Sequence, residues 1–581
     1  MNLINLRSQR VAPYLIFIFI VTIFFTVISV SAYQIEFDPI PQMKGIQQWL
    51  RGESTLLNSL VTVNPKDISQ NLQTWIVWHA PGVSMAFLPL TAIGLPLGVA
   101  ARTTAYILFV SGGIGWLKVL DAIGSDFRVK MIVACLLSLY YLEIGCSFIF
   151  TAGDVIPWAV LPWLLVYTIY ICSQLDLRSK SYNHMLLHSA LLGLLLGGVY
   201  WLKYSGFLVS IGVLTYIIIN LLFFNQSHSL LKRLIILAIC TVSTLLPVIC
   251  LTVIHQSLAG VTSAVEQFEN AIPVPSPDTR GWRLLVSFLA SPGLALFNSE
   301  IFAGNRLLMY TNIIVKNLFG LDISEKKEIF KTLVGLGGTL VVAWFFMYSA
   351  KNICDKKALT FWCCITVIPF VFIAYVSNKA GVNLLILGIS RYGSSFFILT
   401  VFYILTSYLH LISNLEESKV SKVLASLVLI FFLLMPPLSS IADAVGAMSL
   451  RKDYVTGENF LYVNLLSKKN VKSVVAKVNS AVKSPQDVVV LAKDSRDYRF
   501  SSWLEIKSRF LPLNGVEQEG ENSKITSSQD LRVILVVSKI IEQDEKIMMR
   551  IKQRFVQATG WTRLSEDIDA EVSIWFADLK A

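Results

Sequence analysis

Long apolar runs recur along most of this chain. From residue 13 to residue 442, stretches of about 20 mostly apolar residues alternate with shorter polar connectors. A helix of that length spans the hydrocarbon layer of a membrane, so the pattern predicts an α-helical polytopic membrane module over residues 1–442. Residues 443–581 are charged and show an alternating pattern, which predicts a small soluble α/β domain after the membrane module.

Hydropathy and basic residues together indicate about eleven transmembrane helices. The predicted spans are 13–32, 85–118, 129–151, 155–173, 185–201, 206–224, 232–254, 332–350, 358–377, 392–413 and 420–442. The second is a long or broken segment, because Gly94, Pro96 and Gly98 interrupt it. With the N-terminus inside, every cytoplasmic connector then carries at least two basic residues, as the positive-inside rule requires. Two full spans within 85–118 would put those connectors outside.

The first apolar run has two possible roles. Arg7 and Arg10 precede the run at 11–30, and the residues at 30–32 fit a signal-peptide cleavage site. The run is longer than a usual signal core and many spans follow it, so we expect a retained anchor. Either reading places residue 33 outside the cytoplasm.

Two outer segments are much longer than ordinary connectors. The first outer loop, residues 33–84, begins with an acidic segment at 36–39 and ends with an aromatic, proline-containing segment at 75–82. Loops of this size often have a function, so we expect this one to roof an active site at the membrane surface. The second outer segment, residues 255–331, contains two amphipathic stretches that we expect to lie along the outer interface.

Composition supports a membrane protein and argues against nucleic-acid binding. Hydrophobic residues make up 54% of the chain and charged residues 15%, below the roughly one quarter usual in soluble domains. Basic cytoplasmic connectors account for the net charge of +11, and the soluble part has no basic patch with interleaved aromatic residues. The 8 cysteines lie in or beside apolar spans without Cys-x-x-Cys spacing, so we expect neither a disulfide framework nor a zinc site.

The C-terminal segment predicts a small α/β layer. A polar amphipathic helix is expected within 453–484, buried strands at 487–492 and 531–537, a helix over 539–556 and a strand at 571–576. The sequence here has no glycine-rich nucleotide loop, so it assigns this domain no catalytic role.

Two carboxylates are candidates for chemistry on the outer face. Asp38 directly follows the first span, and Asp154 lies in a tight turn between the third and fourth spans. Alone, Asp38 fits a turn before Pro39 and Asp154 fits a helix N-cap. Together they could be a base and an orienting group for an acceptor hydroxyl or amine, with Glu36 as a secondary candidate. Glu143, within the third span, fits an internal hydrogen-bonding group better than a catalyst.

Four further residues at outer helix ends suit an anion. The positive-inside bias does not explain Lys203 at an outer end, and Arg391 and Tyr392 begin another span from outside. Lys203 and Arg391 could be anchors that snorkel to the interface, or they could clamp a phosphate there. His79, within 75–82, is either an interfacial residue or a further phosphate or acceptor contact.

The order of these motifs resembles that of the GT-C fold glycosyltransferases. It is most similar to the bacterial branch that includes the aminoarabinose transferases of lipid A and the protein O-mannosyltransferases. In those families an acidic motif opens the first outer loop and a Lys/His-Pro-Pro-like segment closes it, which Asp38 and His-Ala-Pro-Gly at 79–82 resemble. An aspartate in the second outer loop is matched by Asp154. Leu-Lys-Tyr-Ser-Gly at 202–206 and the Arg-Tyr pair at 391–392 match the later motifs.

The resemblance implies an integral membrane glycosyltransferase with its site and its C-terminal domain outside the cytoplasmic (inner) membrane. It would transfer a sugar from a polyprenyl-phosphate donor to an envelope lipid, glycan or protein. Asp38 would deprotonate or orient the acceptor, and Asp154 would support it, with Mg²⁺ or Mn²⁺ if a divalent cation takes part. The remaining candidates would hold the donor phosphate: Lys203, Arg391, Tyr392 and His79.

Two other classes of function stay open. A lipid or glycan transporter would be expected to have internal repeats and polar residues on broken helices at the membrane midplane. The sequence shows no repeated halves, and the charged candidates gather at one face. A GT-C-like assembly subunit without catalysis is the other class, because Asp38 stands where relatives often have two carboxylates.

Overall fold

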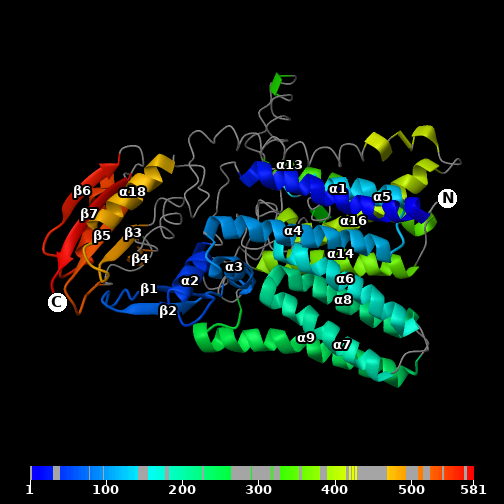
Figure 1. Cartoon of the computed structure of the whole chain (residues 1–581), viewed down its shortest axis with the longest axis horizontal. Helices are drawn as coiled ribbons and strands as arrows, with labels where there is room; N and C mark the ends of the chain where they lie inside the picture. The colour runs from blue at the N-terminus through cyan, green and yellow to red at the C-terminus, as the bar shows by residue number, and fades with distance from the viewer. Residues whose placement is uncertain are drawn as a thin grey trace.

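The computed structural model describes a helical bundle with a small sheet at one end (Figure 1). The described residues are 3–29, 40–77, 79–95, 97–139, 141, 155–176, 182–224, 228–263, 285, 289–290, 316–317, 327–352, 356–379, 389–413, 418–420, 422–423, 425–427, 468–492, 508–513, 524–538, 542–567 and 572–581.

The bundle confirms the predicted helical module. Its long helices are α1 (Leu3–Ser29), α4 (Leu97–Ala122), α5 (Phe127–Leu139), α6 (Val155–Asp176), α7 (Tyr182–Leu202), α8 (Phe207–Ile219), α9 (Leu230–Ala259), α13 (Lys327–Asn352), α14 (Lys356–Lys379) and α16 (Ile389–Ser413). Each predicted span from 13–32 to 392–413 overlaps a described helix, whereas the span at 420–442 lies mostly outside the described residues. By length and composition, 5 of the described helices can cross a membrane.

Small residues allow the helices to pack closely. Gly193 and Gly197, one turn apart, present a stripe of α7 without side chains to α9. A Cβ atom at Gly193 would lie 2.3 Å from the Cys240 carbonyl oxygen, and one at Gly197 would lie 2.2 Å from that of Thr244. This spacing lets two membrane helices approach to backbone contact, where van der Waals packing and not water exclusion holds them together.

The outer surface of α9 is apolar. The side chains of Leu231, Val242 and Val253 are each at least 60% exposed. A protein surrounded by water rarely exposes such a row of large aliphatic side chains, whereas lipid tails are equally apolar. This surface therefore fits the hydrocarbon layer of a membrane.

The second predicted span is broken, as its glycine and proline residues indicate. The short helix α3 (Gly82–Ala92) ends before Gly94, which has a φ of +92°, in the left-handed region that favours glycine. The long helix α4 then begins at Leu97. The helix α3 packs against α2 (Ile40–Leu50), α4, α6 and α7. We call the end of the bundle where α2, α3 and the hairpin of the first outer loop lie the loop end (Figure 1).

The first outer loop has regular structure that its sequence pattern did not predict. It contains α2 (Ile40–Leu50) and a hairpin of two antiparallel strands, β1 (Ser59–Val63) and β2 (Asn71–Trp75). The Gln48 side chain of α2 joins the hairpin by donating from Nε2 to the Val61 carbonyl (2.7 Å) and accepting the Val61 N–H at Oε1 (2.9 Å). The loop is therefore a folded unit of helix and hairpin.

The C-terminal domain is a five-stranded mixed sheet between two helices. Its strands, in the spatial order β4-β3-β5-β7-β6, are β3 (Val488–Ala492), β4 (Arg509–Leu513), β5 (Leu531–Ser538), β6 (Thr562–Asp567) and β7 (Val572–Leu579). β3 is parallel to β4 and β5, and β7 is antiparallel to β5 and β6. The helices α18 (Lys468–Ala481) and α21 (Glu545–Gln553) bury their apolar residues against opposite faces of this sheet.

Much of this domain matches its predicted elements. The strands predicted at 487–492, 531–537 and 571–576 correspond to β3, β5 and β7, and α18 lies within the predicted helix. The edge strands β4 and β6 were not predicted. The predicted helix over 539–556 is interrupted at Asp544 and ends at Gln553. The Asp544 side chain caps the start of α21 by accepting two backbone N–H groups, each at 3.1 Å.

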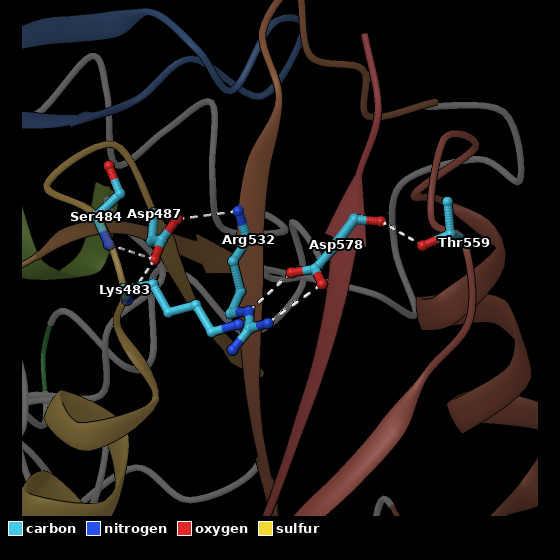
Figure 2. Close-up of polar contacts among 6 residues, drawn as sticks. All are labelled: Lys483, Ser484, Asp487, Arg532, Thr559 and Asp578. Atoms are coloured by element: carbon cyan, nitrogen blue, oxygen red, sulfur yellow. Dashed lines mark hydrogen bonds and ion pairs between the residues drawn. The ribbon is translucent and has the colours of Figure 1, made fainter.

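Two carboxylates hold the strands of this sheet in register (Figure 2). Asp487 is 2% exposed and accepts the N–H groups of Lys483 (2.6 Å) and Ser484 (2.8 Å) in the turn before β3. Its other oxygen accepts the N–H of Arg532 on β5 (3.0 Å). The Arg532 guanidinium donates two hydrogen bonds to the Asp578 carboxylate of β7 (2.7 and 3.2 Å). This ion pair holds the pKa of the Asp578 carboxyl below its usual range.

The hairpin of the first outer loop is built into the C-terminal domain. Ile68, in the turn between β1 and β2, is fully buried in the apolar cluster of that domain. Its N–H donates to the Thr526 carbonyl (2.9 Å), and its own carbonyl accepts from Arg509 Nη2 (2.8 Å). The loop is thus attached at one side to the sheet domain, and we call this contact the hairpin junction.

Asp67 adds charge-assisted hydrogen bonds to the hairpin junction. The Ser69 hydroxyl donates to its carboxylate, and the Ser528 N–H (3.1 Å) and hydroxyl (3.0 Å) donate from the C-terminal domain. These bonds, that from Ser69 above all, lower the pKa of Asp67 from 3.8 to about 2. A carboxyl with a lowered folded-state pKa stabilises the fold above its unfolded pKa, and that contribution is lost as the pH falls towards about 2. At neutral pH Asp67 is therefore ionised and contributes its full stabilisation to the hairpin junction.

We expect Asp67→Ala to loosen the hairpin junction. The exposed Lys66 precedes Asp67, and the Thr526 hydroxyl donates to its carbonyl (2.7 Å). Trypsin should therefore cleave the variant after Lys66 several-fold faster than the wild type, measured by mass spectrometry of a digestion time course. Asp544→Ala, which removes a cap elsewhere in the domain, should leave that rate unchanged. Equal rates for Asp67→Ala and the wild type would contradict this role.

Candidate functional site

The end of the first outer loop lies directly on the end of α7. A Cβ atom at Gly82, the first residue of α3, would lie 2.2 Å from the Leu202 carbonyl oxygen and 2.4 Å from the Leu202 Cα. Only glycine allows this approach of two backbones, because any side chain would overlap the neighbouring chain. The contact places the segment from His79 to Gly82 beside Leu202 and therefore next to Lys203.

Lys203 occupies the sharp break between α7 and α8. Its backbone is extended, with φ −163°, and it precedes a single 3₁₀ turn, η2 (Tyr204–Gly206), after which α8 begins. The residue is only 9% exposed. A lysine held this deep at the end of a membrane helix is costly, and such positions usually serve an anion or an ion pair.

The start of α6 meets the same turn. A Cβ atom at Gly206 would lie 2.9 Å from a methyl group of Val199 and 3.3 Å from Cβ of Pro157, in the first turn of α6. α16, which carries Arg391 and Tyr392 in its first turn, also packs against η2. Three helices (α6, α7 and α16) and the end of the first outer loop thus converge on the residues around Lys203.

Tyr204 and His255 connect this turn to the loop. The Tyr204 hydroxyl donates to the Val77 carbonyl (2.9 Å) and lies 3.3 Å from Nε2 of His255. His255 is fully buried near the end of α9, and its ring centroid is 6.4 Å from that of Trp75. The sequence reasoning did not select His255, although its place just after the span at 232–254 is a signal that could have identified it.

A buried polar network supports the loop from inside. Asn58 donates to the Ile76 carbonyl (2.8 Å) and accepts from Ser84 Oγ (3.0 Å) and Gln42 Nε2 (2.8 Å). Gln42 Nε2 also donates to the Ala80 carbonyl (3.0 Å). All three side chains are at most 1% exposed, so breaking one bond leaves a buried polar group without a partner. The network fixes the backbone on both sides of His79.

Among the sequence-predicted site residues, the structure brings His79 and Lys203 into neighbouring segments. Arg391 and Tyr392 lie on the helix that packs against η2, and only their backbone is described. The other candidates lie outside the described residues: Asp38, Asp154, Glu36 and Glu143. In the sequence, Asp38 comes two residues before α2 and Asp154 immediately before α6, and α6 meets the site at Pro157.

The described residues bring a lysine, a tyrosine and a histidine together where the first outer loop meets the helices. Within them, no group of three or more His, Cys, Asp or Glu side chains is placed to hold a metal ion. What they do provide is a nearly buried ammonium group, a tyrosine and a histidine where four elements meet. Such an arrangement suits a phosphate or another anion at the membrane surface.

Comparisons with known proteins give structural but not sequence matches. No protein-family model matches the sequence, and no curated protein matches it significantly. The structure is similar to that of ArnT from Cupriavidus metallidurans bound to undecaprenyl phosphate, with 9% identity, 99% of this chain and 98% of that chain covered, and a TM-score of 0.49.

An archaeal enzyme is similar as well. The structure of the Archaeoglobus fulgidus oligosaccharyltransferase tethered to an acceptor peptide shares 10% identity and covers 96% of this chain and 73% of its own, with a TM-score of 0.48. The oligosaccharyltransferase AglB from the same organism, in complex with an inhibitory peptide and a dolichol-phosphate, has 10% identity, coverages of 98% and 74% and a TM-score of 0.48.

We expect Gly82→Ala to separate the loop from α7. The new methyl group would overlap the Leu202 backbone, and overpacking of this kind costs about 1–3 kcal/mol. Thermal unfolding of the purified protein in detergent should therefore occur at a lower temperature. Gly198→Ala on α7 is the matched control, because a Cβ atom there meets nothing within 4 Å. It should leave the unfolding temperature unchanged or raise it. Equal unfolding temperatures for Gly82→Ala and the control would show that the contact is not close.

Proposed function

We propose that this chain is a membrane glycosyltransferase that uses a polyprenyl-phosphate-linked sugar. Transfer takes place on the outer face of the cytoplasmic membrane, and the acceptor is an envelope lipid, glycan or protein. The observation that supports this best is the contact of Gly82 with Leu202, because it brings the loop segment with His79 to Lys203. This contact supports the proposal, because two motifs about 120 residues apart in the sequence lie in neighbouring segments.

The proposed reaction is a displacement at the anomeric carbon of the sugar. An acceptor oxygen or nitrogen forms a bond to that carbon while the bond from carbon to the phosphate oxygen breaks. Asp38 accepts the proton of the acceptor, and Asp154 orients the acceptor for the reaction. Their carboxylates are also the ligands that Mg²⁺ or Mn²⁺ would take if transfer uses a divalent cation. The polyprenyl phosphate leaves with an added negative charge.

Cationic and polar groups of this chain stabilise that leaving phosphate. Lys203, in surroundings partly shielded from water, attracts a phosphate more strongly than an ammonium group in bulk water would. Arg391, with a guanidinium whose fork fits a phosphate, and Tyr392 supply further contacts. His79 contacts either the phosphate or the acceptor. A donor bound outside the cytoplasm requires no nucleotide-binding loop.

A transporter of lipids or glycans is the second candidate. The break between α3 and α4 is the observation that favours it, because transporters bind their substrates at interrupted helices. The break, however, lies at the loop end of the bundle and not halfway along it (Figure 1). A subunit with this architecture but without catalysis would share the lipid-binding residues and lack turnover.

We expect Lys203→Gln to change the lipids and glycans of cells in the same way as deletion of the whole protein. Without the ammonium group the donor phosphate binds weakly, so an untransferred polyprenyl-phosphate sugar should accumulate, measured by mass spectrometry of extracted lipids and envelope glycans. Lys419→Gln, which changes an exposed lysine away from the site, should restore the wild-type profile.

Two results would count against the proposal. An unchanged lipid and glycan profile after deletion of the protein would favour the transporter or the non-catalytic subunit. A wild-type profile with Lys203→Gln, when deletion does change the profile, would remove Lys203 from the phosphate site and leave the enzyme class standing.

A further inference from the structure

Two histidines lie side by side on α7, away from the candidate site. His184 and His188 are one turn apart, with ring centroids 4.1 Å apart and their Nε2 atoms 3.0 Å apart. His184 is exposed and His188 is half-buried. About 21 Å of helix separates His188 from Leu202, so the pair does not belong to the site around Lys203.

The tautomers of the two rings are coupled. Two ring nitrogens at 3.0 Å share a hydrogen bond, so in the neutral pair one Nε2 has a proton and the other a lone pair. On its other side, His188 Nδ1 lies 2.6 Å from the hydroxyl of Tyr167 on α6. The Tyr167 hydroxyl can accept the proton of Nδ1 as well as donate its own, so it permits either tautomer of His188.

We propose that His184 and His188 form a binding site for a divalent transition-metal ion of the copper and nickel type. In the bound state both rings hold their proton on Nδ1, and both Nε2 lone pairs point at the ion. Histidines at positions i and i+4 of a helix are a recurrent way to chelate one ion from one helix face. No covalent or redox step is involved, and binding to the neutral pair needs only a change of tautomer.

The separation of the two nitrogens fits chelation of one ion with little movement of the rings. Ligand nitrogens about 2.05 Å from an ion lie about 2.9 Å apart at a right angle and about 3.3 Å apart at the tetrahedral angle. The observed 3.0 Å is closer to the right angle. Right angles belong to square-planar and octahedral ions such as Cu²⁺ and Ni²⁺, whereas Zn²⁺ in proteins is mostly tetrahedral.

Tyr167 acts as the outer partner that fixes one ligand. With the ion bound, His188 Nδ1–H donates to the Tyr167 oxygen, which holds the ring in position and raises the basicity of Nε2. Among the described residues no third His, Cys, Asp or Glu completes the set. In the proposed site, water occupies the other coordination positions. The site is therefore open to exchange with ions in solution.

The test is a titration of the full-length, tag-free protein in detergent with Cu²⁺, Ni²⁺ and Zn²⁺, each as the metal alone. Calorimetry should show one Cu²⁺ per chain, bound more tightly than Zn²⁺, and electron paramagnetic resonance should show coupling to imidazole nitrogen. His184→Ala and His188→Ala should each abolish this binding. Tyr167→Phe should weaken it by about 10–100-fold without changing the number of sites.

His410→Ala is the matched control, because His410 is another helix histidine whose ring lies beside a tyrosine, Tyr348 (3.2 Å). It should bind Cu²⁺ as the wild type does. Gel filtration and unfolding temperature show whether each variant is folded, and the exposed His184 is the substitution least able to disturb the fold. Three results would each overturn the proposal. The wild type could fail to bind Cu²⁺, or it could bind Zn²⁺ more tightly than Cu²⁺. Folded His184→Ala could bind Cu²⁺ as the wild type does.

Discussion

The approach of Gly82 to the Leu202 backbone is the constraint on which the rest of the candidate site depends. It allows the end of the first outer loop to rest on the end of α7, directly before Lys203. Hydrogen bonds from Tyr204 to Val77 and within the Asn58 network then hold the loop backbone in that place. At its far side the loop is fixed by the hairpin junction with the C-terminal domain, so the proposed roof is held at both ends.

The sequence alone predicts the architecture well where one periodicity persists over many residues. Apolar runs predict the helices, and the continuous apolar runs at 488–491 and 533–537 predict β3 and β5. The valines described in these two strands are all buried. The edge strands β4 and β6 and the hairpin of the first outer loop were missed. Their pairing is decided by partners distant in the sequence, such as Arg509 with Ile68, which no local pattern reveals.

The candidate site, too, could be predicted from the sequence only in part. The order of the motifs predicts that the His-Ala-Pro-Gly segment and Lys203 contribute to one site. In the structure, Gly82 of that segment lies on the backbone of Leu202, the residue before Lys203. His255 was missed, although it directly follows the span at 232–254. The Gln42–Asn58–Ser84 network could not be predicted, because a buried amide or hydroxyl matters only through the groups that surround it. The roles of Asp38 and Asp154 stay predictions, since both lie outside the described residues.

Binding of a polyprenyl phosphate to the purified protein tests the central claim most directly, because it separates recognition of the phosphate from catalysis. The wild type and Asp38→Asn should bind the lipid equally well, whereas Lys203→Gln should bind it at least about tenfold more weakly, as loss of one charge-assisted contact predicts. A matching lipid alcohol without the phosphate should not distinguish the three proteins. Equal binding of the polyprenyl phosphate by wild type and Lys203→Gln would contradict the account.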